Sequence, residues 1–332
     1  MKTLQRLFVI NLVFIFSFSC LDRQRKEPIE RIYSCSDSSD LANYPKNFIK
    51  RESTNDYLVH PDLKDKFSVK SLNLANAYGM IPLLKKLIKI RKEEESKKNS
   101  TSSSLEFNRL KLRINASLEF ASIDISGSAS EMHCYAERMS DFIRILQNKE
   151  RDSIKNYTLV SLMIAASFTI MSGAVQWQSD TLQSAVNFIG GFSSGYFGYQ
   201  ATTYETQTEF VPEKKVLSEF WYANPESSVF SDPLWYLINH KPDRDQKENS
   251  LREELIKHWI EADYLGEKDT EKRELAISTF FRSERKHSID DLMLIREMNR
   301  QIGVAIQLTL QDIKLLDREI DLQSENQLDK EE

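Results

Sequence analysis

Residues 157–175, YTLVSLMIAASFTIMSGAV, and residues 184–201, SAVNFIGGFSSGYFGYQA, are two apolar segments that together decide the fold. Between Lys155 and Glu205 the chain carries one charged side chain, Asp180, although charged residues make up 29% of the whole sequence. The short polar sequence QWQSDTLQ separates the two segments. This pattern predicts a helical hairpin suited to lipid or to a dry protein interior.

The hairpin, residues 157–202, is long enough to cross a membrane. Its first segment spans about 28 Å at about 1.5 Å per residue, against about 30 Å of bilayer hydrocarbon. The second segment is less apolar, and its small residues predict a face on which another helix packs closely. We favour insertion in a membrane over burial in a soluble helical assembly or a tongue that inserts conditionally. The predicted packing face comprises Gly191, Ser194, Gly195 and Gly198.

The N-terminus has the outline of a secretory signal. Residues 1–19 contain Lys2 and Arg6, then an uncharged run rich in Leu, Phe, Ile and Val, and the segment ends directly before Cys20. It resembles a bacterial lipoprotein signal peptide, and the resemblance implies that Cys20 is lipidated and becomes the mature N-terminus. The alternatives are another cleaved signal and an uncleaved N-terminal anchor.

Three cysteines and the net charge restrict the compartment and the partners. With Cys20 lipidated, Cys35 and Cys134 remain as one possible disulfide in an oxidising compartment, the alternative being two free thiols. The chain carries a net charge of −5, which becomes −5 − 2 = −7 without the two cations of the signal. An acidic chain lacks the surplus of cations that nucleic-acid binding needs. The expected partners are therefore membrane lipid, other envelope proteins or a second copy of the chain.

Composition and periodicity predict an all-α fold, a long-helix bundle or stalk with a central hydrophobic, glycine-rich helical hairpin. Glycine and proline are scarce, at 9 and 8 residues, and helix-forming residues abound. Apolar side chains recur every three or four residues in two long stripes, which we expect to pack together. The first stripe runs through Phe107, Leu110, Ile114, Leu118, Ala121, Ile125, Ala129, Met132, Tyr135, Met139, Phe142 and Leu146. The second runs through Leu292, Ile295, Met298, Ile302, Ile306, Thr309, Ile313, Leu316 and Ile320.

Composition shifts and capping patterns divide the chain into segments. Ser103 with Glu106, and Ser288 with Asp291, match the capping box that opens a helix. Asp232 is the expected cap of a short helix, and the aromatic side chains around it are expected to form core or, alternatively, an interfacial belt. The predicted segments are a signal peptide (1–19), a tether (20–65), a helix and polar linker (66–104), a long helix (105–156), the hairpin (157–202), short aromatic-rich helices (203–240) and C-terminal helices (241–332).

The sequence contains no phosphate-binding loop, no nucleophile elbow, no HExxH motif and no paired CxxC. His133 beside Cys134, and His258 between Glu254 and Glu261, lack the further ligands or partners that a metal site or nucleophile needs. We therefore expect no metal, no cofactor and no enzymatic activity, and we identify no small-molecule substrate.

These expectations converge on a non-enzymatic lipoprotein of the bacterial cell envelope, attached to the outer membrane or the periplasmic face. It would act as a helical scaffold or adaptor for protein partners. The alternative is a membrane-inserting protein that forms pores or permeabilises membranes with its hairpin. The order of long helix, apolar hairpin and long helix is similar to the tail-and-tongue arrangement of α-helical pore-forming toxins.

Overall fold

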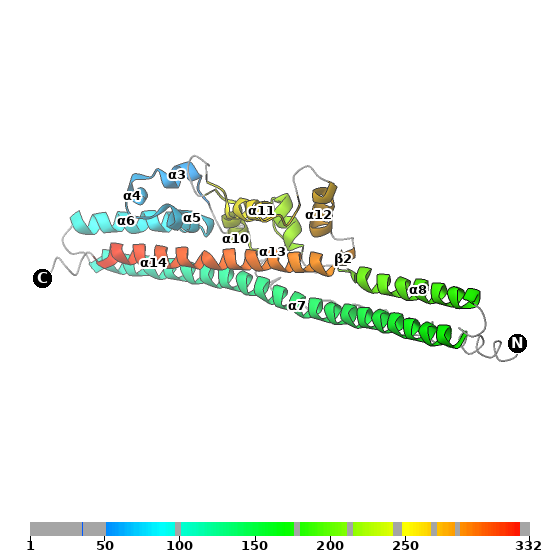
Figure 1. Cartoon of the computed structure of the whole chain (residues 1–332). Helices are drawn as coiled ribbons and strands as arrows, with labels where there is room; N and C mark the ends of the chain where they lie inside the picture. The colour runs from blue at the N-terminus through cyan, green and yellow to red at the C-terminus, as the bar shows by residue number, and fades with distance from the viewer. Residues whose placement is uncertain are drawn as a thin grey trace. The chain divides into compact units, whose positions relative to one another are not determined.

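One helix, α7 (Thr101–Val175), runs through both the first apolar stripe and the first hairpin segment without a break (Figure 1). The computed structural model describes residue 35 and residues 51–96, 101–175, 180–210, 215–241, 248–266, 271–282 and 286–325. The predicted capping box at Ser103 does not open α7, which begins at Thr101. Glu106 instead pairs with Lys86 at 2.7 Å between Nζ and Oε1, so its carboxylate serves another contact.

The C-terminal helices α13 (Ile289–Leu308) and α14 (Leu310–Glu325) pack antiparallel along α7. A Cβ added to Gly303 of α13 would lie 3.0 Å from Cβ of Met132, and Lys111 pairs with Asp321 at 2.9 Å. The expected partnership of the two stripes is confirmed, because nearly all their aliphatic members are buried. The second stripe is divided between two helices, because α13 ends before Thr309, whose hydroxyl donates to the Ile306 carbonyl oxygen at 2.7 Å.

Residues 51–65 are folded, which corrects the expected tether over residues 20–65. They form α3 (Thr54–Leu58) and α4 (Pro61–Lys64), and the side chains of Tyr57 and Leu63 are fully buried. Helices of one turn are too short to show periodicity, so the sequence did not reveal them. Residues 20–34 and 36–50 lie outside the described part of the chain.

The one helix predicted in the segment 66–104 is two helices. They are α5 (Val69–Ala77) and α6 (Ile81–Ser96), separated by a turn at Gly79 with φ of +69°. This left-handed conformation suits glycine and ends α5. The helix α6 extends into the sequence expected to be a polar linker, and residues 97–100 lie outside the described part.

Four short helices and a two-stranded sheet complete the fold. The aromatic group is core in part, since Phe230 and Trp235 are at most 4% exposed whereas Tyr222 is 47% exposed. The helix α10 is capped by Ser231 in place of Asp232. The small antiparallel sheet was not expected; it pairs Gln207 with Ser288. The capping box at Ser288 is confirmed and opens α13 directly after the sheet. These elements are β1 (Gln207–Glu209), α9 (Val216–Tyr222), α10 (Asp232–Asn239), α11 (Leu251–Glu261), α12 (Glu271–Phe281) and β2 (Lys286–Ser288).

Candidate membrane-inserting hairpin

The end of α7 and the helix α8 (Asp180–Thr203) form an antiparallel hairpin (Figure 1). About one turn above its base, the Ser161 hydroxyl donates to the Ser194 carbonyl oxygen at 2.8 Å and lies 3.2 Å from the Ser194 hydroxyl. Where the hairpin joins the rest of the protein, the rings of Tyr157 and Tyr204 lie 5.6 Å apart. The two helices are therefore in contact over the first turns above the base of the hairpin.

The interior of the hairpin is built from small side chains. A Cβ added to Gly190 would lie 2.4 Å from Cβ of Phe168, so only glycine allows this approach of the helices. Gly198 is the next close point, because a Cβ added there would lie 3.6 Å from the Ser161 hydroxyl oxygen. The interface on α8 therefore follows Gly190, Ser194 and Gly198, at a spacing of four residues.

Two of the four residues of the predicted packing face lie against α7. Ser194 and Gly198 lie in the interface, but Gly191 and Gly195 face away from α7, since a Cβ added at either position would meet no atom within 4 Å. Two sets of small residues alternate on α8, and the spacing alone does not show which set meets α7. The close contact at Gly190 was missed for this reason.

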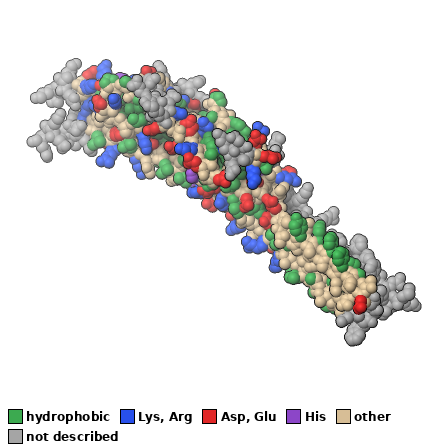
Figure 2. Space-filling view, turned by 45° about the horizontal axis from the view of Figure 1, so that its top comes forward, with side chains coloured by type: hydrophobic (Ala, Val, Ile, Leu, Met, Phe, Trp, Pro, Cys, Tyr) green, Lys and Arg blue, Asp and Glu red, His purple; other side chains and the backbone are tan. Residues whose placement is uncertain are grey.

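The exterior of the hairpin is lined by large apolar side chains. Ile170 is 74% exposed, Phe188 76% and Phe192 71%. Figure 2 shows hydrophobic and uncharged side chains over this part, whereas charged side chains are dense over the rest of the visible surface. The large apolar side chains of the hairpin that face outward are Leu159, Leu162, Met163, Ile170, Phe188, Ile189, Phe192, Tyr196 and Tyr199. This distribution inverts the order of a soluble protein, in which such side chains gather inside.

Within the described residues, α7 is the one helix long and apolar enough to cross a membrane, and only 6% of its apolar window is buried. The helix α8 falls short, as its Gly, Ser and Asn content leads one to expect. The hairpin thus combines one strongly apolar helix with a second that depends on its partner for close packing.

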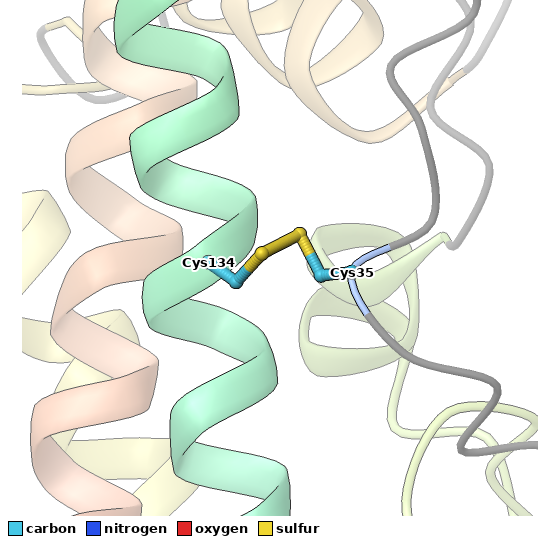
Figure 3. Close-up of a disulfide and its surroundings, with 2 residues drawn as sticks. All are labelled: Cys35 and Cys134. Carbon is cyan, nitrogen blue, oxygen red and sulfur yellow. A yellow bond between two sulfur atoms is a disulfide. The ribbon is translucent and has the colours of Figure 1, made fainter.

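A disulfide joins Cys35 to Cys134 in the middle of α7 (Figure 3). The two Cα atoms lie 5.8 Å apart, and 99 positions separate the cysteines in the chain. This is the pair singled out from the sequence. The bond attaches the N-terminal region to the helix that continues into the hairpin.

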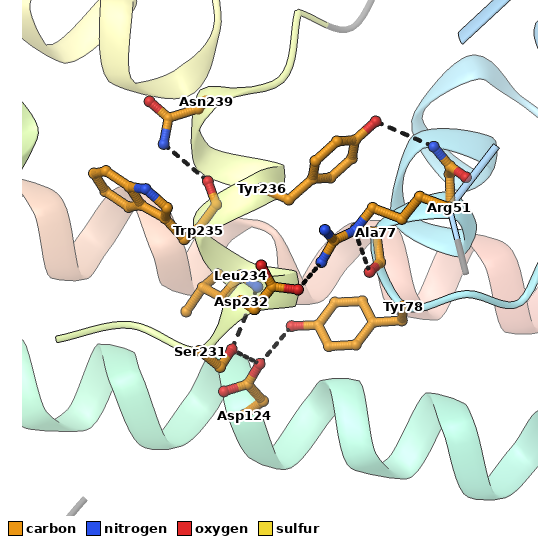
Figure 4. Close-up of polar contacts among 11 residues, drawn as sticks. Arg51, Ala77, Tyr78, Asp124, Ser231, Asp232, Leu234, Trp235, Tyr236 and Asn239 are labelled. Atoms are coloured by element: carbon orange, nitrogen blue, oxygen red, sulfur yellow. Dashed lines mark hydrogen bonds and ion pairs between the residues drawn. The ribbon is translucent and has the colours of Figure 1, made fainter. Parts of the chain in front are cut away.

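A buried carboxylate holds three segments of the bundle together (Figure 4). Asp124 of α7 is 1% exposed, and its Oδ2 accepts hydrogen bonds from the hydroxyl groups of Tyr78 and Ser231. Ser231 in turn caps α10 through the Leu234 amide. Burial raises the pKa of the Asp124 carboxyl, while the hydrogen bonds from Ser231 and Tyr78 act in the opposite direction. This arrangement fastens α10 and the turn after α5 onto α7.

The histidines considered from the sequence have structural contacts. The Nε2 atom of His133 lies 3.2 Å from Oε1 of Gln307, and its neighbour Cys134 is bonded to Cys35 and so has no free thiol. The ring of His258 lies 6.4 Å from that of Tyr264. Among the described residues, no three His, Cys, Asp or Glu side chains gather as metal ligands would.

The predicted signal peptide, residues 1–19, and the predicted lipidation site, Cys20, lie outside the described part of the chain. No family model matches this chain, and no curated protein or solved structure matches it.

Proposed function

We propose that this protein is a non-enzymatic, membrane-associated helical scaffold of a bacterial envelope, with its hairpin held in lipid. The observation that carries the proposal is the inverted hairpin, in which small and polar groups lie between the helices and large apolar side chains lie outside. Moving one such side chain from water into hydrocarbon contributes about 1.5–3 kcal/mol. Summed over all the outward-facing apolar side chains, the transfer free energy strongly favours placing the hairpin in lipid over leaving it in water.

The polar pair between the two helices fits the same environment. The Ser161 hydroxyl is paired with Ser194, so inserting the hairpin would leave neither hydroxyl exposed to hydrocarbon. The hairpin backbone is helical on both sides, which satisfies its amides internally. Tyr157 and Tyr204 lie at its base, where tyrosine is favoured at the membrane surface.

A lipid on Cys20 would give a second attachment, and one membrane face can accommodate both. Cys134 precedes Tyr157 by 23 residues, which is about 34 Å of helix. Cys20 precedes Cys35 by 15 residues, which can span up to about 50 Å when extended. Because the disulfide fixes Cys35 beside Cys134, the intervening chain is long enough to reach the membrane at the base of the hairpin.

The scaffold role follows from the part of α7 outside the hairpin. The 57 residues from Thr101 to Tyr157 extend about 84 Å, and they carry the bundle of α13, α14 and the shorter helices. We propose that this bundle presents its surface to other envelope proteins or to a second copy of the chain.

Paired charge substitutions test the membrane insertion. Ile170 in the hairpin and Leu112 in the bundle are exposed to similar extents, 74% and 69%, on the same helix. In a Cys20→Ala background, Ile170→Arg should release the protein from membranes on carbonate washing, because an arginine at the bilayer centre costs about 2.5–3.5 kcal/mol or more. Leu112→Arg should leave membrane retention unchanged. Equal retention of the two variants would contradict insertion.

Labelling with a fatty-acid analogue tests the second attachment. Wild-type protein should incorporate the label and Cys20→Ala should not. A freely soluble and fully active Cys20→Ala protein would contradict the scaffold as proposed.

A permeabilising protein is the second candidate, favoured by the order of a long helix, a nearly uncharged hairpin and further long helices. It predicts a protein that is soluble before assembly and that releases dye from lipid vesicles. A scaffold predicts membrane retention from the outset and no dye release.

A further inference from the structure

A cavity of about 30 Å³ lies beside the small sheet that follows the hairpin. Its lining includes Tyr135 of α7, Phe210 directly after β1, His287 of β2 and Asn299 of α13. It therefore lies where the chain leaving α8 meets the long helices. The ring of Phe210 contacts the His287 ring edge to face at 6.0 Å and forms one wall.

Two polar atoms in this lining have no hydrogen-bond partner within the described residues. They are Nδ1 of His287 and Oδ1 of Asn299, on side chains only 2% and 1% exposed. The orientation of the Asn299 amide is fixed, because its Nδ2 donates to the Ile295 carbonyl oxygen at 2.8 Å. The unpaired Asn299 atom is therefore an acceptor, and leaving it unpaired away from water would be costly.

We infer that the cavity binds an ordered water molecule that bridges His287 and Asn299. The volume exceeds the 10–15 Å³ or so that one water needs, and buried waters in proteins commonly join polar groups that otherwise lack partners. Water can donate to Asn299 Oδ1 and can either donate to or accept from His287 Nδ1, so it fits both tautomers of a neutral imidazole.

Charge argues against cationic ligands, and hydrogen bonding argues against anionic ones. Lys215 and Arg282 also line the cavity, which disfavours a metal cation or an ammonium group. An anion without a proton would face the acceptor oxygen of Asn299 and gain no hydrogen bond there. A neutral donor of the size of water satisfies both constraints.

The bound water connects β2 to α13 through its own hydrogen bonds. His287 pairs with Thr208 in the sheet, and Thr208 lies two residues before Phe210. The water thus stabilises the junction between the end of the hairpin and the bundle, whether or not the hairpin enters lipid.

The inference is tested by measuring the free energy of unfolding of two single variants and of the double variant, and by asking whether each change lowers or raises it. With the water present, Asn299→Leu and His287→Phe should each lower the folded-to-unfolded ratio by about fivefold or more, because each leaves the water and one polar group short of a partner. The double variant, which makes the lining apolar, should recover most of that loss. Asn239→Leu is the matched control, since Asn239 makes the same bond to the carbonyl four residues earlier but is only partly buried.

Without the water, each single variant removes an unpaired polar atom and should raise stability, with additive effects in the double variant. That outcome would overturn the inference. A crystal structure of the full chain that resolves ordered water should show density between His287 and Asn299, and its absence at this site would overturn the inference as well.

Discussion

Replacing Gly190 by alanine should open the hairpin. The new Cβ would lie 2.4 Å from Cβ and 2.6 Å from Cγ of Phe168, and both of these atoms are close to the backbone of α7. Carbon atoms pack at about 3.5–4.0 Å, so the helices must separate by about 1 Å or more. The same shift would lengthen the 2.8 Å bond between Ser161 and Ser194 beyond hydrogen-bond range.

The expected cost combines two terms. Overpacking of this kind typically costs about 1–3 kcal/mol. A hydrogen bond between helices in a membrane contributes about 0.6 kcal/mol on average. The sum, about 2–4 kcal/mol, should reduce the closed form of the hairpin at least tenfold relative to the open form, since 1.4 kcal/mol is about a factor of ten.

The assay is oxidative cross-linking between Ser161→Cys and Ser194→Cys, whose side-chain oxygens lie 3.2 Å apart. The two cysteines already remove the Ser161–Ser194 hydrogen bond, so only the overpacking cost of about 1–3 kcal/mol applies here, and Gly190→Ala should slow the formation of this disulfide about tenfold. The neighbouring Gly191→Ala is the control, because no atom lies within 4 Å of its added Cβ and the rate should stay unchanged. Equal rates in the two variants would refute the proposed helix contact.

Three further predictions concern the bundle. Replacing Cys134 by serine should lower the free energy of unfolding by up to about 4–5 kcal/mol, measured by denaturant unfolding, because the disulfide to Cys35 closes a long loop; an unchanged midpoint would contradict this. Gly303→Ala should cost about 1–3 kcal/mol in the same measurement, since its Cβ would meet Met132 Cβ at 3.0 Å and the Ala129 carbonyl oxygen at 3.4 Å. The raised pKa of Asp124 means that the folded state binds the proton more tightly than the unfolded state, so stability falls as the pH rises from about 4 through the folded pKa. Asp124→Asn should remove this slope from a plot of Tm against pH and should not lower Tm at pH 7; a retained slope would contradict the assignment.

The sequence was most informative where apolar side chains recur at helical spacing over many turns. The stripes of α7 and of α13 with α14 repeat over many turns, so their burial and their partnership could be predicted. Short elements gave no such signal. The helices α3 and α4 and the strands β1 and β2 have only three to five residues each, and tertiary contacts decide their conformation.

The existence of the hairpin could be predicted from the sequence, but the residues of α8 that face α7 could not. The lack of charge identified the hairpin, and the apolar length identified the stronger of its helices. The choice between Gly190 and Gly191 depends on how α8 is rotated about its axis, which alternating small residues leave open. Two capping predictions were wrong because neighbouring residues make other contacts. Ser231, not Asp232, caps α10, and the carboxylate of Glu106 pairs with Lys86.

Ser288 has two roles at once, as the last residue of β2 and as the residue whose hydroxyl caps α13. Its partner across the sheet is Gln207, four residues after the end of α8. Only a short connection therefore separates the end of α8 from the start of α13. With the hairpin in a bilayer as proposed, a change in its tilt would therefore act first on this two-stranded junction and on the N-terminal turn of α13.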